Sequence, residues 1–357
     1  MPTFPRARLA AALLAAAGAL AACAAQTTVT DAAPADAAPP DAAPTAPSDS
    51  RPENGPDGGP ALPDGWRWES YRDVQLAVPG DWTWIGGSQR TSQWCIEEST
   101  PTGIGRPGFA TEALCIGDSE GGVSPGTRIA RNGTFVAFDQ AEWTKSGTVG
   151  DRTTVALGDV AVQVQAAPRL RDRILATLHH IDVDASGCAV RDEVTTNPSL
   201  APSPAVALAD LARVRSVASC LYDIDWYPDD PHEGPTLVAS VRIQGAAAAA
   251  ALAGLAAAPA AGGQDAASSC LYKYGSQMVV LLVDSAAGSS RVHVRFSGCD
   301  HNAVDDGASP RRLTPALRPF FSGPVLPDAF SGGFGKAEAL FGLRPDGTVP
   351  PPTSPPS

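Results

Sequence analysis

Two short motifs in this sequence have the letters of catalytic or nucleotide-binding sites, but each lacks a feature that the chemistry needs. Gly122-Val-Ser124-Pro-Gly126 matches the G-x-S-x-G pattern of a nucleophilic serine. In that pattern the residue after the serine donates its backbone N–H to the oxyanion, and Pro125 has no N–H. Gly103-Ile-Gly105-Arg-Pro-Gly108 matches the dinucleotide fingerprint, which must open a helix. Pro107 interrupts it and no helical pattern follows, so we predict that both stretches are turns.

The histidines and the acidic turn offer little further chemistry. His179 and His180 are predicted to end a helix, His293 lies in a strand, and His232 and His301 lie in polar turns. Asp223 and Asp225 could open a calcium loop, and further acidic residues follow them: Asp229, Asp230 and Glu233. However, the fifth, sixth and twelfth positions are Tyr227, Pro228 and Gly234, which do not suit such a loop. We therefore expect a solvated loop, and we predict no catalytic residue, no metal site and no cofactor.

The seven cysteines carry the clearest chemical information, and their first member stands apart. Leu20-Ala-Ala-Cys23 follows a short basic start and an apolar run, as in an export signal. The motif resembles the lipobox of bacterial lipoproteins, which implies cleavage before Cys23 and a diacylglycerol on its thiol. Two acyl chains suffice for stable membrane anchoring. Release by ordinary signal peptidase is the alternative.

Six cysteines remain after Cys23, and an even number in an exported protein indicates disulfides. No Cys-x-x-Cys occurs, which argues against zinc or thioredoxin-like redox chemistry. Proximity along the chain and the expected strand order favour three pairs: Cys95–Cys115, Cys188–Cys220 and Cys270–Cys299. The competing arrangement pairs Cys220 with Cys270, because both lie in similar Ser-Cys-Leu-Tyr segments.

The chain divides by composition into five segments. We predict a signal peptide (1–22), a lipidated, disordered Ala/Pro/Asp linker (23–64), two folded domains (65–189 and 190–324) and an extension with a Pro-rich tail (325–357). In the folded regions the patterns predict α+β sandwich-type domains with mainly antiparallel sheets. The elements that support this are strands at 74–78, 134–138, 160–165, 219–222, 236–243, 277–284 and 291–296, and helices at 169–180, 246–257 and 313–321.

The region 65–189 resembles the PsbP-type α/β sandwich of exported proteins. The resemblance is carried by an early strand running into Val78-Pro-Gly-Asp-Trp82, several further strands and a closing Ile174-Leu-Ala-Thr-Leu178 helix. The region 190–324 is similar to uncharacterised secreted lipoproteins of high-GC Gram-positive bacteria, through its Cys-Leu-Tyr segments, Ala-rich helix and Phe296-Ser-Gly-Cys299. These resemblances imply a fold and a location but no catalytic residues.

A cluster of tryptophans is the remaining candidate for binding. Trp66, Trp68, Trp82 and Trp84 are close in sequence, and Trp66 and Trp68 share one face of an extended chain, as do Trp82 and Trp84. Most such rings pack into a core, but an exposed pair could stack on a sugar.

The net charge of −12 argues against a nucleic-acid partner. We therefore expect a lipid-anchored, extracytoplasmic, non-enzymatic protein that binds an envelope protein or cell-wall glycan. The alternative is an exported enzyme whose site joins sequence-distant residues.

Overall fold

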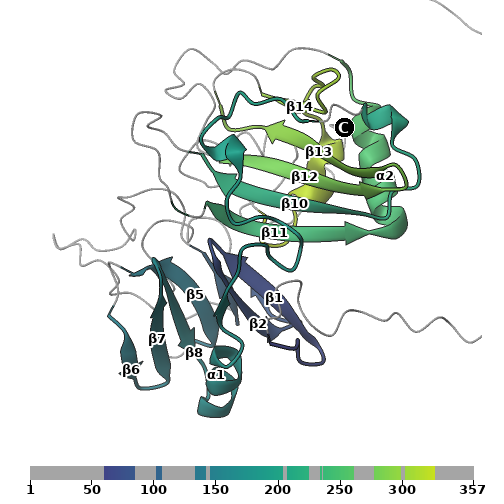
Figure 1. Cartoon of the computed structure of the whole chain (residues 1–357). Helices are drawn as coiled ribbons and strands as arrows, with labels where there is room; N and C mark the ends of the chain where they lie inside the picture. The colour runs from purple at the N-terminus through teal and green to yellow at the C-terminus, as the bar shows by residue number, and fades with distance from the viewer. Residues whose placement is uncertain are drawn as a thin grey trace, which may run out of the picture. The chain divides into compact units, whose positions relative to one another are not determined.

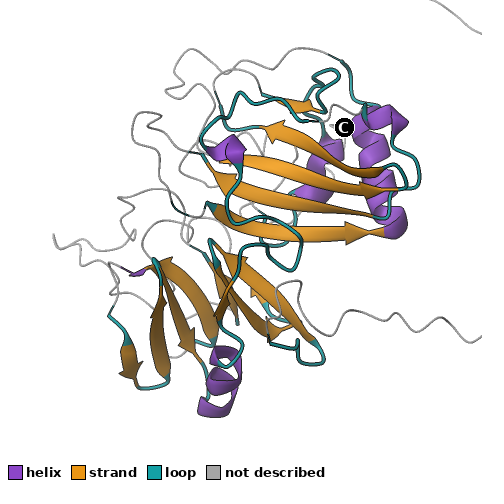
Figure 2. Ribbon diagram, viewed as in Figure 1, coloured by secondary structure: helices purple, strands orange, loops and turns teal. Residues whose placement is uncertain are grey.

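Three β-sheets form most of the structure, which is a computed structural model (Figures 1 and 2). It describes residues 60–84, 102–106, 133–141, 145–203, 207–224, 234, 236–260, 277–298 and 302–325. Two α-helices and short 3₁₀ helices accompany the sheets in these ranges. Most strand pairs are antiparallel, which confirms the predicted α+β class.

Two sheets come from the first half of the described chain. One has the order β1-β2-β9, with strands at Trp66–Tyr71, Val74–Pro79 and His179–His180. The other has the order β3-β4-β5-β8-β7-β6, with strands at Thr83–Trp84, Gly103–Gly105, Phe135–Gln140, Val160–Gln165, Arg152–Leu157 and Gly147–Val149. The pairs β3–β4 and β4–β5 are parallel. The turn predicted from Gly103 is therefore wrong for Gly103–Gly105, because pairing with two distant strands makes this stretch a strand.

Helix α1 (Pro168–Leu175) is shorter than the helix predicted over 169–180. The amides of Thr177 and Leu178 donate to the carbonyls of Ile174 and Leu175, three residues earlier, and this tighter turn ends the helix. His179 and His180 then pair with β2 as strand β9. The prediction that these histidines lie at a helix C-terminus is therefore wrong, because pairing with a distant strand overrides the local helical spacing.

The third sheet comes from the second half and is antiparallel throughout. Its order is β11-β10-β12-β13-β14, with strands at Leu237–Gln244, Ser216–Asp223, Gln277–Ser285, Gly288–Arg295 and Ala303–Asp305. Helix α2 (Gly245–Ala256) follows β11 directly, and Gly245 makes this turn with a φ of +59°. A 3₁₀ helix at Pro315–Phe320 takes the place of the short helix predicted over 313–321.

The two faces of the third sheet carry different hydrophobic clusters. Val217, Leu221 and Leu281 pack in the main core with α2, through its buried residues Ala248, Ala251, Leu252 and Leu255. The alternate residues of the same strands, including Cys220 and Val280, pack in a second cluster with Cys188 and Val194. The segment that contains Cys188 therefore covers the face opposite α2.

Several predictions concern residues outside the described ranges. These are the signal peptide and Cys23, most of the linker, the turn predicted at 122–126, the second Ser-Cys-Leu-Tyr segment at 269–272 and the C-terminal tail. The division into domains at residue 189 stays a prediction.

Candidate functional site

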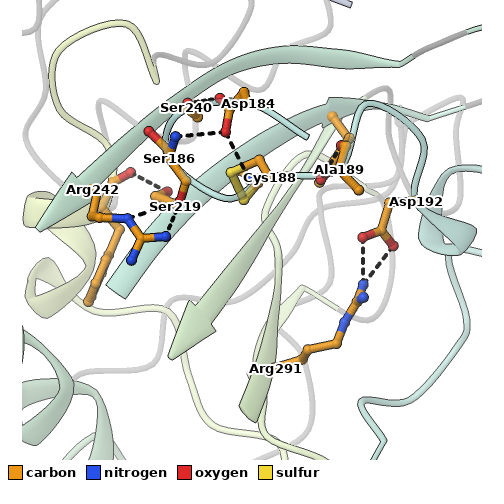
Figure 3. The surroundings of a disulfide bond; sticks show 12 residues. Asp184, Ser186, Cys188, Ala189, Asp192, Ser219, Ser240, Arg242 and Arg291 are labelled. Carbon is orange, nitrogen blue, oxygen red and sulfur yellow. Dashed lines mark hydrogen bonds and ion pairs between the residues drawn. A yellow bond between two sulfur atoms is a disulfide. The ribbon is translucent and has the colours of Figure 1, made fainter. Parts of the chain in front are cut away.

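Residues 184–203, which we call the strap, cross the third sheet and contact its strands in the order in which they lie in the sheet. Near its start the strap bonds to β11 and β10, and farther along it bonds to β13 (Figure 3). Within β12, Met278 and Val280 lie in the hydrophobic cluster beneath it. The strap is therefore fastened at separate points by covalent, ionic and hydrogen-bonding contacts.

A disulfide joins the strap to the sheet at Cys188 and Cys220. The two Cα atoms lie 5.7 Å apart and both cysteines are buried. This confirms one of the predicted pairs and excludes the alternative of Cys220 with Cys270. The other four cysteines (Cys95, Cys115, Cys270 and Cys299) lie outside the described residues.

Asp184 organises the start of the strap. One carboxylate oxygen accepts the amides of Ser186 (2.9 Å) and Cys188 (2.8 Å), and the other accepts the hydroxyl of Ser240 on β11. Burial raises the pKa of the Asp184 carboxyl, and these hydrogen bonds oppose the rise. Arg242 donates to the Ser186 carbonyl, so the same turn is held from β11 by two side chains.

The middle of the strap is held by Asp192 and Ala189. A single terminal nitrogen of Arg291 on β13 contacts both carboxylate oxygens of Asp192, at 2.7 and 2.6 Å. The hydroxyl of Tyr222 donates to the Ala189 carbonyl at 2.8 Å. Asp192 also accepts the amide of Val194 at 3.1 Å and so caps a short 3₁₀ helix.

The end of the strap rests on two side chains of β13. Arg295 donates to the carbonyls of Pro198 (2.9 Å) and Leu200 (2.8 Å), and also contacts Asp305 at 3.0 Å. Nδ1 of His293 lies 3.1 Å from the same Leu200 carbonyl. His293 is buried, and its Nε2 has no hydrogen-bond partner among the described residues. Burial is the main cause that lowers the pKa of His293 to about 4.

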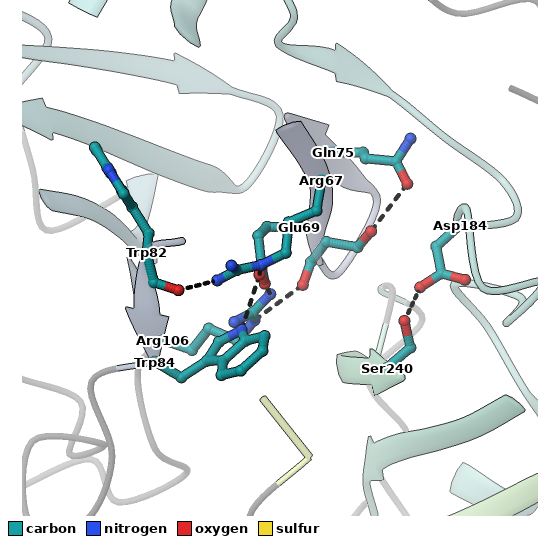
Figure 4. Close-up of polar contacts among 9 residues, drawn as sticks. Arg67, Glu69, Gln75, Trp82, Trp84, Arg106, Asp184 and Ser240 are labelled. Carbon is teal, nitrogen blue, oxygen red and sulfur yellow. Dashed lines mark hydrogen bonds and ion pairs between the residues drawn. The ribbon is translucent and has the colours of Figure 1, made fainter. Parts of the chain in front are cut away.

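A second polar cluster surrounds Glu69 on β1 (Figure 4). Its carboxylate accepts Arg67 (2.7 Å) and the indole N–H of Trp84 (2.8 Å) on one oxygen, and Arg106 (2.5 Å) on the other. The side chains of Glu69 and Arg106 are each only 2% exposed. Arg67 also donates to the carbonyls of Gly80 and Trp82, so this cluster ties β1 to the turn after β2. Its charged groups are all engaged in contacts within the protein.

The four candidate tryptophans are not gathered on one surface. Trp66 and Trp68 share a face of β1, where they contact Arg173 (4.6 Å) and His179 (5.4 Å) respectively. Trp84 contacts Arg67 and Glu69, which alternate with them along β1, and the Arg67 guanidinium lies 4.2 Å from the Trp84 ring centre. The remaining ring, Trp82, is buried. A stacking role for any of them stays a prediction.

The other candidate groups are distributed over the fold. The predicted placement of His293 in a strand is confirmed, whereas His232, His301 and the acidic turn at 225–233 lie outside the described residues. Asp223 ends β10 and accepts Gln277 at 3.0 Å. The described ranges contain no group of three or more metal-ligating side chains. Within them, no helix has both the length and the apolar character needed to cross a membrane.

The sequence placed His293 in a strand but did not group it with the other polar residues under the strap. Arg291, His293 and Arg295 occupy alternate positions of one strand, with Val292 and Val294 between them. This alternation places three cationic or titratable side chains on one face, opposite an apolar one. This alternation could have predicted a polar face that another segment covers, but it could not identify the covering segment.

Comparison with known proteins gives no relative: no family model, no curated protein and no solved structure matches this chain.

Proposed function

We propose that this protein is an extracytoplasmic lipoprotein, held at the membrane by Cys23, whose folded part binds a ligand or partner of the cell envelope. The observation that carries the proposal is the buried Cys188–Cys220 disulfide. Structural disulfides form and persist in oxidising compartments and are rare where thiols are kept reduced. Together with the lipobox-like Leu20–Cys23, the disulfide favours a protein that is exported and then tethered.

The composition between Cys23 and the first strand supports a tether. Proline, alanine and aspartate dominate this stretch, which carries three Asp-Ala-Ala-Pro repeats. Such segments stay extended because proline restricts φ and like charges repel. About 40 residues at about 3 Å each would reach on the order of 100 Å, enough to hold a folded domain within a cell wall.

The anchor is tested by the substitution Cys23→Ser in the producing cell. We expect the variant to leave the membrane fraction and appear in the soluble extracytoplasmic fraction. The Cys188–Cys220 bond should still form, which peptide mapping under non-reducing conditions would show. A variant that stays membrane-bound would contradict the proposed anchor, while release with a scrambled disulfide would indicate misfolding instead.

The binding role is tested on insoluble peptidoglycan and on envelope proteins separately. Trp68 is the first residue to change, because its ring is only partly buried and contacts His179. If wall glycan is the ligand, Trp68→Ala should lower retention on peptidoglycan, whereas Arg215→Gln, at an exposed ion pair, should not. No retention of the wild-type chain would rule out the glycan and leave an envelope protein as the partner.

One observation favours the alternative of an enzyme. Nδ1 of His180 lies 3.3 Å from Asp73, and the imidazole is half-exposed. A solvent-accessible histidine that is oriented by a carboxylate can act as a general base. If the wild-type chain hydrolyses an envelope glycan or ester, His180→Gln should abolish that activity with unchanged unfolding; an unaffected rate would exclude this pair.

A further inference from the structure

The two halves of the strap are held by different forces. Cys188, Val190, Val194 and Thr195 in the first half are buried. In residues 196–203, Pro202 alone is buried, and the others are exposed or half-buried. The second half therefore gains little from apolar burial, and Arg295 and His293 of β13 hold it through the Pro198 and Leu200 carbonyls.

His293 lies under this weakly buried half, in an unusual electrostatic setting. Arg291 and Arg295 flank it on its own strand, while Val280 of β12 and Asp305 of β14 lie opposite in the register. The negative charge of Asp192, on the strap, also acts on it. Both carboxylates are already engaged, Asp192 by Arg291 and Asp305 by Arg295.

Neutral His293 fits this setting and protonated His293 does not. The neutral ring donates from Nδ1 to the Leu200 carbonyl and leaves Nε2 as an acceptor without a partner among the described residues. A proton on Nε2 would create a buried charged donor with no acceptor among the described residues, beside two guanidinium groups. Such a donor costs far more than a neutral unsatisfied atom, and exposing it to water removes that cost.

We propose that His293 is an acid-operated clasp: its protonation releases residues 196–203 from β13, while the Cys188–Cys220 bond keeps the first half of the strap on the sheet. The released half would uncover Arg295 and His293 without unfolding the sheet. This inference concerns the folded part only and holds whether or not the proposed anchor or ligand is correct.

The direction of the pH dependence follows from the depressed pKa of His293, about 4 in the closed structure. A released histidine would have a pKa of about 6.5. The open form therefore binds more protons between these values, and the closed form loses stability as the pH falls from about 6.5 to about 4. For one proton, the ratio of open to closed strap changes by up to tenfold per pH unit. Over the interval between the two pKa values, this ratio would rise by up to about 300-fold.

Hydrogen exchange on the full-length, oxidised chain tests the clasp. The informative amides are those of Asn197 and Leu200, which donate to Glu193 and Asn197 carbonyls at 2.9 and 3.0 Å. After correction for intrinsic exchange rates, we expect their protection to fall at least tenfold between pH 6.5 and pH 4. Protection in β12 and α2 should not change. Unchanged strap protection at pH 4, or simultaneous loss in β12, would overturn the proposal.

Two variants assign the effect to one side chain. His293→Gln keeps an amide donor for the Leu200 carbonyl but cannot take up a proton, so the strap should stay protected at pH 4. His180→Gln removes a half-exposed histidine elsewhere and should open like the wild type. Acid opening that persists in His293→Gln would contradict the proposal. Should this variant not fold, NMR titration of the wild-type His293 ring must give the same midpoint as strap opening; a different midpoint would also contradict it.

Discussion

At the scale of single residues, this protein buries charged groups by surrounding each with donors from more than one segment. Glu69 is contacted by Arg67 from its own strand, by Trp84 from β3 and by Arg106 next to β4. Asp184 takes two amides from its own turn and a hydroxyl from β11. A buried ion pair is costly to break, because the remaining partner keeps its charge without compensation.

Arg106 should therefore be far more sensitive to substitution than an exposed arginine. We expect Arg106→Met to lower the free energy of unfolding by about 3–5 kcal/mol, because it leaves the Glu69 carboxylate buried with fewer donors. Adding Glu69→Gln to this variant should restore part of the loss. Urea unfolding measures both changes. Arg215→Met, which breaks an exposed pair with Asp284, is the control and should change stability very little; an equal loss there would contradict the argument.

The raised pKa of Asp184 predicts that the folding stability depends on pH. Because burial raises its pKa in the folded state, the group favours folding most fully below its unfolded pKa, and this contribution is lost as the pH rises through the folded pKa. Asp184→Asn keeps the shape of the side chain but removes its titratable carboxyl group. The stability of the Asn variant relative to wild type should therefore improve from pH 4 to pH 7 in urea unfolding. Asp184→Ala, which removes every acceptor, should be destabilised by about 2–4 kcal/mol at both values.

At the scale of elements, local patterns identified structure well where neighbours in sequence decide it. The strands at 74–78 and 160–165 and the Ala-rich helix were predicted close to their observed bounds. Helix α1 was predicted to be too long, because Leu178 continues the apolar spacing of the helix. The chain leaves the helix earlier because β9 pairs with β2. The parallel pairs β3–β4 and β4–β5 could not be predicted, since distant contacts alone determine them.

The junction between β11 and α2 depends on one backbone conformation. Gly245 has a φ of +59°, and no atom lies within 4 Å of where its β-carbon would be. Its replacement therefore tests backbone strain without a clash. Gly245→Ala should cost about 1 kcal/mol, and Gly245→Asn less, because asparagine tolerates the left-handed region better. Equal unfolding free energies for the two variants in urea would contradict this explanation.

At the scale of the whole molecule, the cysteines were the best guide that the sequence offered. The pair Cys188–Cys220 was predicted from proximity and strand order, and it is present. The strap itself was not predicted, because its contacts to Arg291, His293 and Arg295 span 93 to 99 residues. Only the folded arrangement shows that these groups meet.

Removing the disulfide should weaken the fold without changing its architecture. The two cysteines are 32 residues apart, and the chain-entropy model gives a loss of about 3–4 kcal/mol for a loop of that length. We expect the double variant Cys188→Ala, Cys220→Ala to show this loss in urea unfolding. Its far-ultraviolet circular dichroism should match the wild type. A stability equal to that of the wild type would mean that the bond is not formed in the isolated protein.

The Cys188–Cys220 bond affects how well a soluble ligand can compete with the strap for the sheet. A covalently tethered segment rebinds to the sheet in an intramolecular step. For a short connection, the effective concentration of the segment at the sheet is on the order of millimolar. A soluble ligand for the uncovered side chains of β13 must overcome that local concentration. After the Cys188–Cys220 bond is cut, the strap stays connected through the backbone alone. Its effective concentration at the sheet then falls, and the same ligand would compete at lower concentration.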